Sequence, residues 1–247
     1  MHSRDFYEEN LLTEREKKKL VKRGKRNSQS LNVMNRGISV FPKTPKQQEL
    51  INAIQENSQI FVLGPAGTGK TYVCASMAAK YLYDRKIDRI IITRPNISGS
   101  ASIGLFPGTL EEKMAPWVAP FTSVLQEHLG EDIYNIAVKK KNIEVIPFET
   151  MRGSSFNDAF VMLDEAQNVE FDELKMFLTR VGENSKVIVN GDLKQSDLKH
   201  TSGYKQVLGY VQKYNMFDTK VIEFDMDDCV RSGICRQWLE VFDKEGV

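Results

Sequence analysis

The sequence predicts an α/β fold in which a mainly parallel sheet carries helices on both faces. Short apolar runs recur along the chain, and stretches with helical apolar spacing lie between them. Strands that are apolar at every position are typical of parallel sheets, because both of their faces are buried. Polar residues follow several of these runs directly, as expected for functional groups at the carboxyl ends of parallel strands. The runs are residues 60–63, 90–93, 143–146, 159–163, 186–189 and 220–224.

The motif with the most specific chemistry is a glycine-rich loop between the first of these runs and a helix. Its pattern, G-x-x-x-x-G-K-[ST], is the P-loop that binds the phosphates of a nucleoside triphosphate. Backbone N–H groups of such a loop point at phosphate oxygens, and the helix start adds partial positive charge. We expect Lys70 to reach the β- and γ-phosphates and the Thr71 hydroxyl to hold Mg²⁺. A plain glycine-rich turn is the alternative, which the flanking strand and helix disfavour. The residues predicted to bind ATP here are Gly64, Pro65, Ala66, Gly67, Thr68, Gly69, Lys70 and Thr71.

An acidic pair, Asp164 and Glu165, directly follows the apolar run at 159–163. P-loop enzymes place an Mg²⁺-directed aspartate after such a strand. We expect Asp164 to hold Mg²⁺ through water, and Glu165 to orient or deprotonate the attacking water. The structural alternative is an acidic helix start favoured by the helix dipole. The P-loop upstream favours the catalytic interpretation.

Four further polar residues are candidates for the same site. Arg94 and Gln195 follow apolar runs, and Gln195 is expected to contact the γ-phosphate. Gln47, at a helix start, offers a paired donor and acceptor for the edge of adenine. Arg231 precedes an amphipathic helix and is a candidate arginine finger, which stabilises charge on the transferring phosphoryl group. Each of the four also has a plainer interpretation as a structural or surface residue.

Composition excludes several classes of protein. The three cysteines and three histidines are scattered, without the spacing of a disulfide scaffold or a zinc site. No apolar run approaches the ~20 residues that span a bilayer, and the amino terminus does not resemble a secretory signal. We therefore expect a soluble protein in a reducing, cytoplasmic setting. The 247 residues, 41% of them apolar, suit one large domain with an extension.

Residues 1–40 are interpreted as a basic, flexible amino-terminal arm, and residues 41–247 as the nucleotide-binding domain. Lys and Arg dominate residues 15–26, although the net charge of the whole chain is only +1. Two interpretations of the arm stand side by side. It is a solvated tail that has too few apolar residues for a core, or it contacts nucleic acid by displacing counterions from phosphates.

Six stretches, taken in order, resemble the PhoH-like ATPase family, which is related to the first core domain of superfamily 1 helicases. They are residues 61–71, 93–95, 105–108, 151–153, 163–168 and 191–198. The resemblance extends from about Pro42 to the carboxyl terminus. It implies a RecA-like fold, ATP hydrolysis with Mg²⁺ and ring-shaped oligomers, with a hexamer favoured. It also implies a nucleic-acid partner, with RNA favoured and single-stranded DNA as the alternative.

Residues 227–231 resemble the acidic-valine-arginine segment near the carboxyl terminus of that family. This strengthens the assignment of Arg231, although Ser232 and Gly233 stand where the family usually has histidine and proline. We expect this chain to lack the second RecA-like domain of superfamily 1 helicases. The resemblance therefore implies that a neighbouring subunit closes the site, and it is open whether Arg231 acts on its own or a neighbour's ATP.

Three functions are compatible with these motifs. The first is an ATP-driven motor or remodeller of nucleic acid, with unwinding left open. The second is a regulatory ATPase switch that controls assembly or partner binding. The third is a small-molecule kinase, which the acidic pair and Gln195 disfavour because they suit water activation. ATP is expected rather than GTP because the N-K-x-D guanine reader is not evident.

Overall fold

A six-stranded sheet forms the centre of the computed structural model, which describes residues 37–95, 110–151, 155–196, 198 and 202–245 together with Arg15 and Lys18. Every pair of neighbouring strands is parallel, in the order β3-β2-β4-β5-β1-β6. The strands are β1 (Gln59–Leu63), β2 (Arg89–Thr93), β3 (Ile143–Val145), β4 (Ala159–Leu163), β5 (Lys186–Gly191) and β6 (Thr219–Glu223). The predicted parallel α/β sheet is confirmed.

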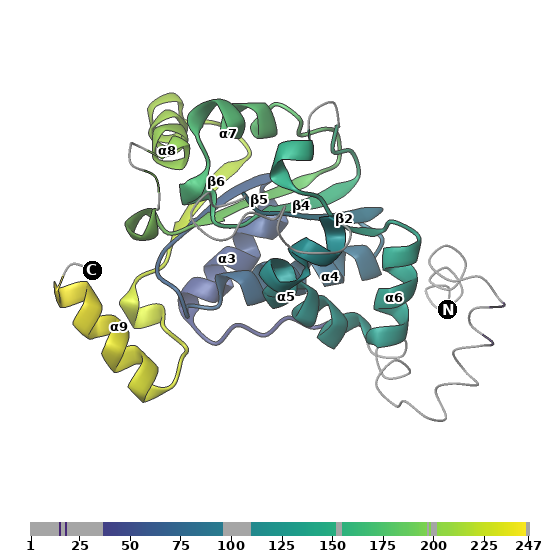
Figure 1. Cartoon of the computed structure of the whole chain (residues 1–247), viewed down its shortest axis with the longest axis horizontal. Coiled ribbons are helices and arrows are strands. Elements are labelled where there is room, and N and C mark those ends of the chain that lie inside the picture. Colours follow the sequence, from purple (N-terminus) through teal and green to yellow (C-terminus); the bar gives the residue numbers. More distant parts are fainter. Residues whose placement is uncertain are drawn as a thin grey trace.

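Helices cover both faces of the sheet, as Figure 1 shows. One face carries α3 (Pro45–Glu56), α4 (Lys70–Tyr83), α5 (Leu110–Leu129) and α6 (Glu131–Lys139), and the other carries α7 (Phe171–Leu178) and α8 (Gly203–Tyr214). Short 3-10 helices form at η2 (Phe148–Thr150), η3 (Ala166–Asn168), η4 (Leu193–Gln195) and η5 (Met226–Asp228). The last helix, α9 (Gly233–Glu245), lies beside the sheet rather than over it.

Two hydrophobic cores follow from the alternation of side chains along each strand. Ile60 and Val62 of β1 pack in one core with residues of α3, α4 and α5. Phe61 and Leu63 pack in the other with residues of α7 and α8. The fully buried Tyr204 of α8 lies against this second core, and its hydroxyl is 3.1 Å from the carbonyl of Val62 and 2.9 Å from that of Val189. This contact connects α8 to the neighbouring strands β1 and β5.

The strand order determines which residues meet at the functional edge. Because all the strands run the same way, their carboxyl ends lie along one edge of the sheet. The P-loop follows β1 and the acidic pair follows β4, and β5 lies between these two strands. The carboxyl end of β5 therefore separates the loop from the acidic pair, with Asn190 and Gly191 at that position.

Helix α9 exposes an apolar face to solvent. Ile234 is 73% exposed, Trp238 58% and Phe242 46%, and the two aromatic rings stack with centroids 5.6 Å apart. None of the helices in the described ranges is both long and apolar enough to cross a membrane.

Several predictions lie outside the described residues. These include nearly all of the basic arm, the family stretch at 105–108 and part of the stretch at 151–153.

Candidate nucleotide-binding site

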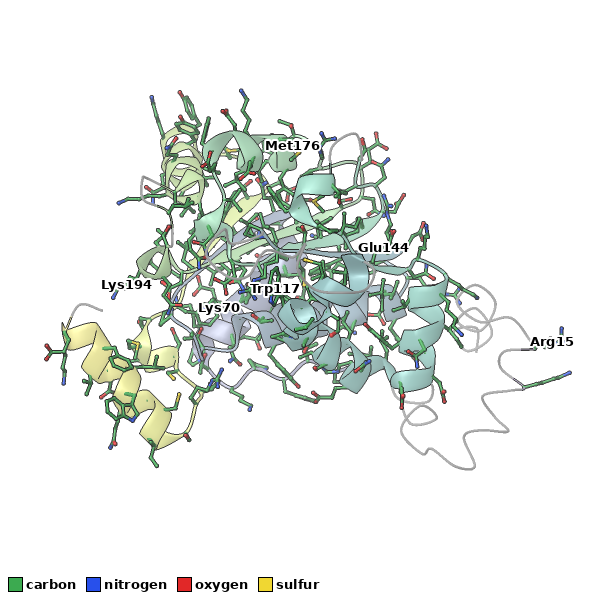
Figure 2. All side chains as sticks on the ribbon, in the orientation of Figure 1. Arg15, Lys70, Trp117, Glu144, Met176 and Lys194 are labelled. Atoms are coloured by element: carbon green, nitrogen blue, oxygen red, sulfur yellow. The ribbon has the colours of Figure 1, made fainter. Side chains whose placement is uncertain are left out.

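A cavity of about 440 Å³ opens at the carboxyl edge of the sheet. Its wall combines the P-loop, the ends of β2, β4 and β5, part of α5 and the segment after η5. Figure 2 shows Lys70 and Trp117 near the centre of the molecule, where these elements converge. Of the residues predicted from the sequence, the cavity is lined by Gly64, Ala66, Gly67, Gly69, Lys70, Thr71, Arg94, Asp164, Glu165, Gln195 and Arg231.

The backbone of the P-loop requires glycine at positions where other parts of the chain approach closely. Gly64 has φ +130°, and a Cβ there would lie 2.4 Å from the carbonyl oxygen of Phe224. Gly67 has φ +86°, and a Cβ there would lie 2.6 Å from Cγ of Arg231. Both conformations are rare for residues with a side chain. The loop is thus held between the sheet and the segment that follows β6.

Lys70 curls back over the loop. Its Nζ donates to the carbonyl oxygens of Gly64 and Pro65, each at 2.7 Å, and lies 3.4 Å from Oγ1 of the buried Thr68. Burial lowers the pKa of the Lys70 ammonium, against an opposing effect of Asp192 and Asp164. A phosphate would offer this cation stronger acceptors than two carbonyls, because its oxygens carry negative charge whereas the carbonyl oxygens are neutral.

The two residues predicted for Mg²⁺, Thr71 and Asp164, meet around a third side chain. Nδ2 of Asn190 donates to Oδ1 of Asp164 at 2.7 Å and lies 3.5 Å from Oγ1 of Thr71. Asp164 is only 8% exposed. Its burial, reinforced by the neighbouring Glu165 carboxylate, raises the pKa of Asp164 to about 6, while Arg94 and the hydrogen bonds act in the opposite direction.

These groups fit Mg²⁺ in the way that nucleotide enzymes hold it. A hydroxyl and a carboxylate are oxygen ligands of the kind that Mg²⁺ prefers, with substrate phosphates and waters completing its shell. Among the described residues there is no cluster of three or more His, Cys, Asp or Glu side chains that would hold a metal alone. The arrangement therefore suits a metal that arrives with a nucleotide.

Glu165 has a left-handed backbone conformation, which is unusual for a residue other than glycine. Its φ of +55° is left-handed, a region that costs a residue with a side chain on the order of 1–3 kcal/mol and often marks functional positions. The carboxylate is held from two sides: Oε1 is 3.4 Å from Nη2 of Arg94, and Oε2 accepts a 2.6 Å hydrogen bond from Nε2 of Gln167. Arg94 is tethered in turn by a 3.2 Å bond to the carbonyl of Trp117.

Gln167 is a residue whose role sequence reasoning missed. It is 1% exposed, and besides Glu165 it contacts the chain after β5. Its Oε1 accepts from the N–H of Asp192 at 3.0 Å, and its Nε2 lies 3.5 Å from the carbonyl of Gln195. It thus connects the acidic pair to η4, which carries the predicted γ-phosphate contact. The sequence feature that could have indicated this role is a polar residue two positions after the acidic pair, which itself follows a buried strand.

Gln47 is placed differently from the expectation that its amide faces adenine. The side chain is 3% exposed, and its Nε2 donates to the carbonyl of Thr68 at 2.9 Å. Its Oε1 accepts from the N–H of Lys43 at 2.8 Å. Gln47 therefore supports the P-loop backbone from behind, and the reading of adenine remains a prediction.

Arg231 lies against the P-loop of its own chain. It is exposed and lines the cavity, and its neighbour Val230 donates its N–H to the carbonyl of Gly67 at 3.0 Å. The backbone between η5 and α9 thus contacts the loop directly. Whether the guanidinium acts on this or a neighbouring subunit's nucleotide stays a prediction.

The strand, loop and helix at 59–83, with an acidic pair at the end of β4 on the same edge, define a P-loop NTPase. The family model for PhoH-like proteins matches residues 39–243, and the chain belongs to this family.

Relatives of this chain are identical to it at more than a third of the aligned positions. It is 39% identical over 207 residues to Protein PhoH of Escherichia coli (strain K12), covering 82% of this chain and 58% of that protein. It is 38% identical over 212 residues to a PhoH-like protein of Bacillus subtilis (strain 168), covering 85% and 66%. The chain thus spans about three fifths of the length of the E. coli relative.

Solved structures resemble it more distantly. The large terminase of a thermophilic bacteriophage aligns with a TM-score of 0.46 at 12% identity, over 82% of this chain and 50% of that one. The Pif1 helicase of Candida albicans aligns with a TM-score of 0.38 at 16% identity, over 75% and 41%.

Proposed function

We propose that this protein hydrolyses ATP with Mg²⁺ and couples the reaction to binding or remodelling nucleic acid, with RNA favoured over single-stranded DNA. The observation that carries the proposal is the convergence of Lys70, Thr71, Asp164 and Glu165 on one cavity at the carboxyl edge of the sheet. A phosphate-binding loop, oxygen ligands for a divalent cation and a carboxylate base are the parts that water attack on a γ-phosphate requires.

Each side chain has a role that its surroundings suit. Lys70 neutralises charge on the β- and γ-phosphates, while Thr71 and Asp164 hold Mg²⁺. Mg²⁺ held by these two residues would offset the negative charge that develops on the phosphates. Glu165, which Arg94 and Gln167 hold from two sides, orients the attacking water and accepts its proton. Gln195, which lines the same cavity, contacts the γ-phosphate.

The nucleic-acid part of the proposal is supported by the basic residues at 15–26 and by the helicase-like order of the motifs. Clustered lysine and arginine bind phosphate backbones by releasing counterions, without regard to sequence. Such binding weakens steeply as salt concentration rises.

We further propose that the chain assembles, with a hexameric ring favoured. Arg231 is exposed at the edge of the cavity, where a guanidinium is accessible to a neighbouring subunit as well as to its own. The apolar face of α9 follows directly, and assembly would remove part of it from water.

The experiment that tests the proposal measures phosphate release from ATP with and without single-stranded RNA. Wild type is compared with Lys70→Ala and with a chain lacking residues 1–36. We expect Lys70→Ala to lower turnover by about 100-fold or more, because it removes a phosphate contact made in the transition state. We also expect RNA to stimulate wild type at low salt, but not the shortened chain. Turnover that survives in Lys70→Ala would contradict the ATPase assignment.

The alternative function is a regulatory switch, and one contact favours it. Because Val230 bonds to Gly67, the nucleotide loop is linked directly to the start of α9. A difference in loop conformation between the ATP and ADP states would then be transmitted to α9, whose apolar face is exposed. Turnover that depends on Lys70 but ignores RNA and DNA, with sedimentation that differs between ATP and ADP, would favour the switch. Identical sedimentation in both states would count against it.

A further inference from the structure

The wall of the nucleotide cavity contains a buried polar atom without a hydrogen-bond partner among the described residues. This atom is Oδ1 of Asn190, at the carboxyl end of β5. The side chain is only 5% exposed. A buried acceptor left unpaired costs about 1–3 kcal/mol, and native structures contain few of them. Such an atom in a cavity wall points to a partner that the protein itself does not supply.

The contacts of the amide determine which of its atoms is free. A carboxylate oxygen only accepts hydrogen bonds, so the nitrogen of Asn190 faces Asp164, at 2.7 Å. The same nitrogen lies 3.5 Å from the Thr71 hydroxyl. The carbonyl oxygen is therefore left without a partner beside the two residues proposed to hold the metal.

The free atom accepts but does not donate, which restricts its partner. An ionised phosphate oxygen is also an acceptor, so Asn190 cannot bind the triphosphate through Oδ1. Lys70 is a nearby donor, but its ammonium is already directed at the carbonyls of Gly64 and Pro65. Water bound to Mg²⁺ is a donor, and an ion held by a few protein oxygens keeps several such waters.

We propose that Asn190 is a positioning residue of the magnesium site, one that acts on both the protein ligands and the water around the ion. Its amide nitrogen holds the Asp164 carboxylate beside the Thr71 hydroxyl. Its carbonyl oxygen accepts a hydrogen bond from a water of the bound Mg²⁺. The inference rests on the proposed function, since it requires that the cavity binds a magnesium nucleotide.

The chemistry at this position is specific to an amide. An aspartate would offer acceptors on both sides and would place a second carboxylate against Asp164, which like-charge repulsion disfavours. A leucine would fill a similar volume but would neither donate nor accept. Partners of this kind typically change metal affinity by about 10- to 100-fold when they are removed.

The test compares Asn190→Ala with wild type in binding a non-hydrolysable ATP analogue, first in EDTA and then over a series of free Mg²⁺ concentrations. Mg²⁺ should increase the affinity for the analogue. We expect the Mg²⁺ concentration that gives half of this increase to be about 10- to 100-fold higher in Asn190→Ala than in wild type. Affinity in EDTA should stay within about twofold, because Asn190 makes no phosphate contact.

The control is Asn184→Gly, at the other end of β5. Asn184 also donates its amide to an aspartate, with Nδ2 2.8 Å from Oδ1 of Asp158. Glycine tolerates its backbone, which has φ +51°. Binding of Mg²⁺ by this variant should match wild type.

Three other outcomes would be decisive. Unchanged Mg²⁺ dependence in Asn190→Ala, with a normal cooperative melt, would overturn the inference. If that variant does not fold, Asn190→Leu preserves the volume and is measured in the same way. Failure of both to fold would overturn it too, because Asn190 would then serve stability. A wild type that binds no nucleotide contradicts the proposed function instead, so the two failures are distinguishable.

Discussion

An asparagine–aspartate hydrogen bond joins the β4 and β5 sides of the sheet at each end of these strands, and the two bonds have different consequences. At the amino end, Asn184 donates to Asp158 at 2.8 Å, and at the carboxyl end Asn190 donates to Asp164 at 2.7 Å. The first pair lies at the surface, where Asn184 is exposed, whereas both members of the second are buried.

The difference shows that position in a parallel sheet determines what an Asn–Asp pair does. Asn184 and Asp158 both have left-handed backbones, with φ of +51° and +49°, and they fasten two surface turns. Asn190 and Asp164 lie beside the P-loop in a cavity, where burial shifts a pKa and leaves an acceptor unpaired. The same kind of contact is structural at one edge and forms part of a candidate metal site at the other.

The largest expected effect separates the two aspartates by activity. Asp164→Asn should lower the rate of ATP hydrolysis by about 100-fold or more, because it weakens the hold on Mg²⁺ at the transferring phosphate. Asp158→Asn should leave the rate within about twofold. Phosphate release at saturating ATP and Mg²⁺ measures both. Equal losses in the two variants would remove the functional distinction between the edges.

Replacing Asp164 should raise the stability of the fold, although it lowers activity. The pKa of Asp164 is raised from 3.8 to about 6, so its charge at pH 8 opposes folding by on the order of 3 kcal/mol. Near pH 4 the folded-state carboxyl is protonated and the unfolded-state one is close to its own pKa of 3.8, so most of this cost has disappeared. The wild-type stability contributed by this residue therefore falls as pH rises from about 4 to 6.

The consequence is that Asp164→Asn should melt at a higher temperature than wild type at pH 8, in EDTA and without nucleotide. At pH 4 the two melting temperatures should converge. Thermal melts by circular dichroism at both pH values test this. An equal advantage at pH 4 and pH 8 would show that removal of the charge is not its cause.

A smaller effect concerns the link between the acidic pair and η4. Gln167→Ala should lower kcat about tenfold, equivalent to about 1.4 kcal/mol, because Glu165 loses the 2.6 Å bond that directs it. The KM for ATP should change little, since the side chain of Gln167 bonds to Glu165, Asp192 and Gln195. Steady-state kinetics separate the two parameters, and a raised KM at constant kcat would contradict the assignment.

The smallest effect is expected at the amino edge. Asn184→Gly removes an exposed hydrogen bond, which contributes about 1 kcal/mol or less to stability. Urea unfolding should show that loss while ATP hydrolysis stays unchanged. A large loss of activity would mean that the amino edge takes part in function after all.

The sheet and the local motifs could be predicted from the sequence. Each strand appeared as an apolar run, with boundaries within a few residues of those observed. Lys70 and Thr71 share one motif and Asp164 and Glu165 another, so their proximity followed from the rule that parallel strands end at one edge. Such local patterns need no knowledge of which strands are neighbours.

What the sequence did not reveal depends on strand order and side-chain direction. Asn190 lies between the P-loop and Asp164 only because β5 is inserted between β1 and β4, a non-local fact. Gln167 looked like one more polar residue after a strand, and its contacts come from the chain after β5. Gln47 was expected to read the edge of adenine from its place at a helix start, and the sequence did not reveal that its amide contacts the backbone of Lys43 and Thr68.

The placement of the two tryptophans offers a direct optical readout of this molecule. Trp117 lies in α5 with its carbonyl bonded to Arg94, whereas Trp238 is 58% exposed on α9, the helix that follows the loop-bound segment. Replacing Trp238 by phenylalanine leaves one indole, whose emission reports on the catalytic side. Replacing Trp117 instead leaves an indole that reports on the carboxyl-terminal helix. The two variants thus follow the cavity side and the carboxyl-terminal helix separately, without an attached dye.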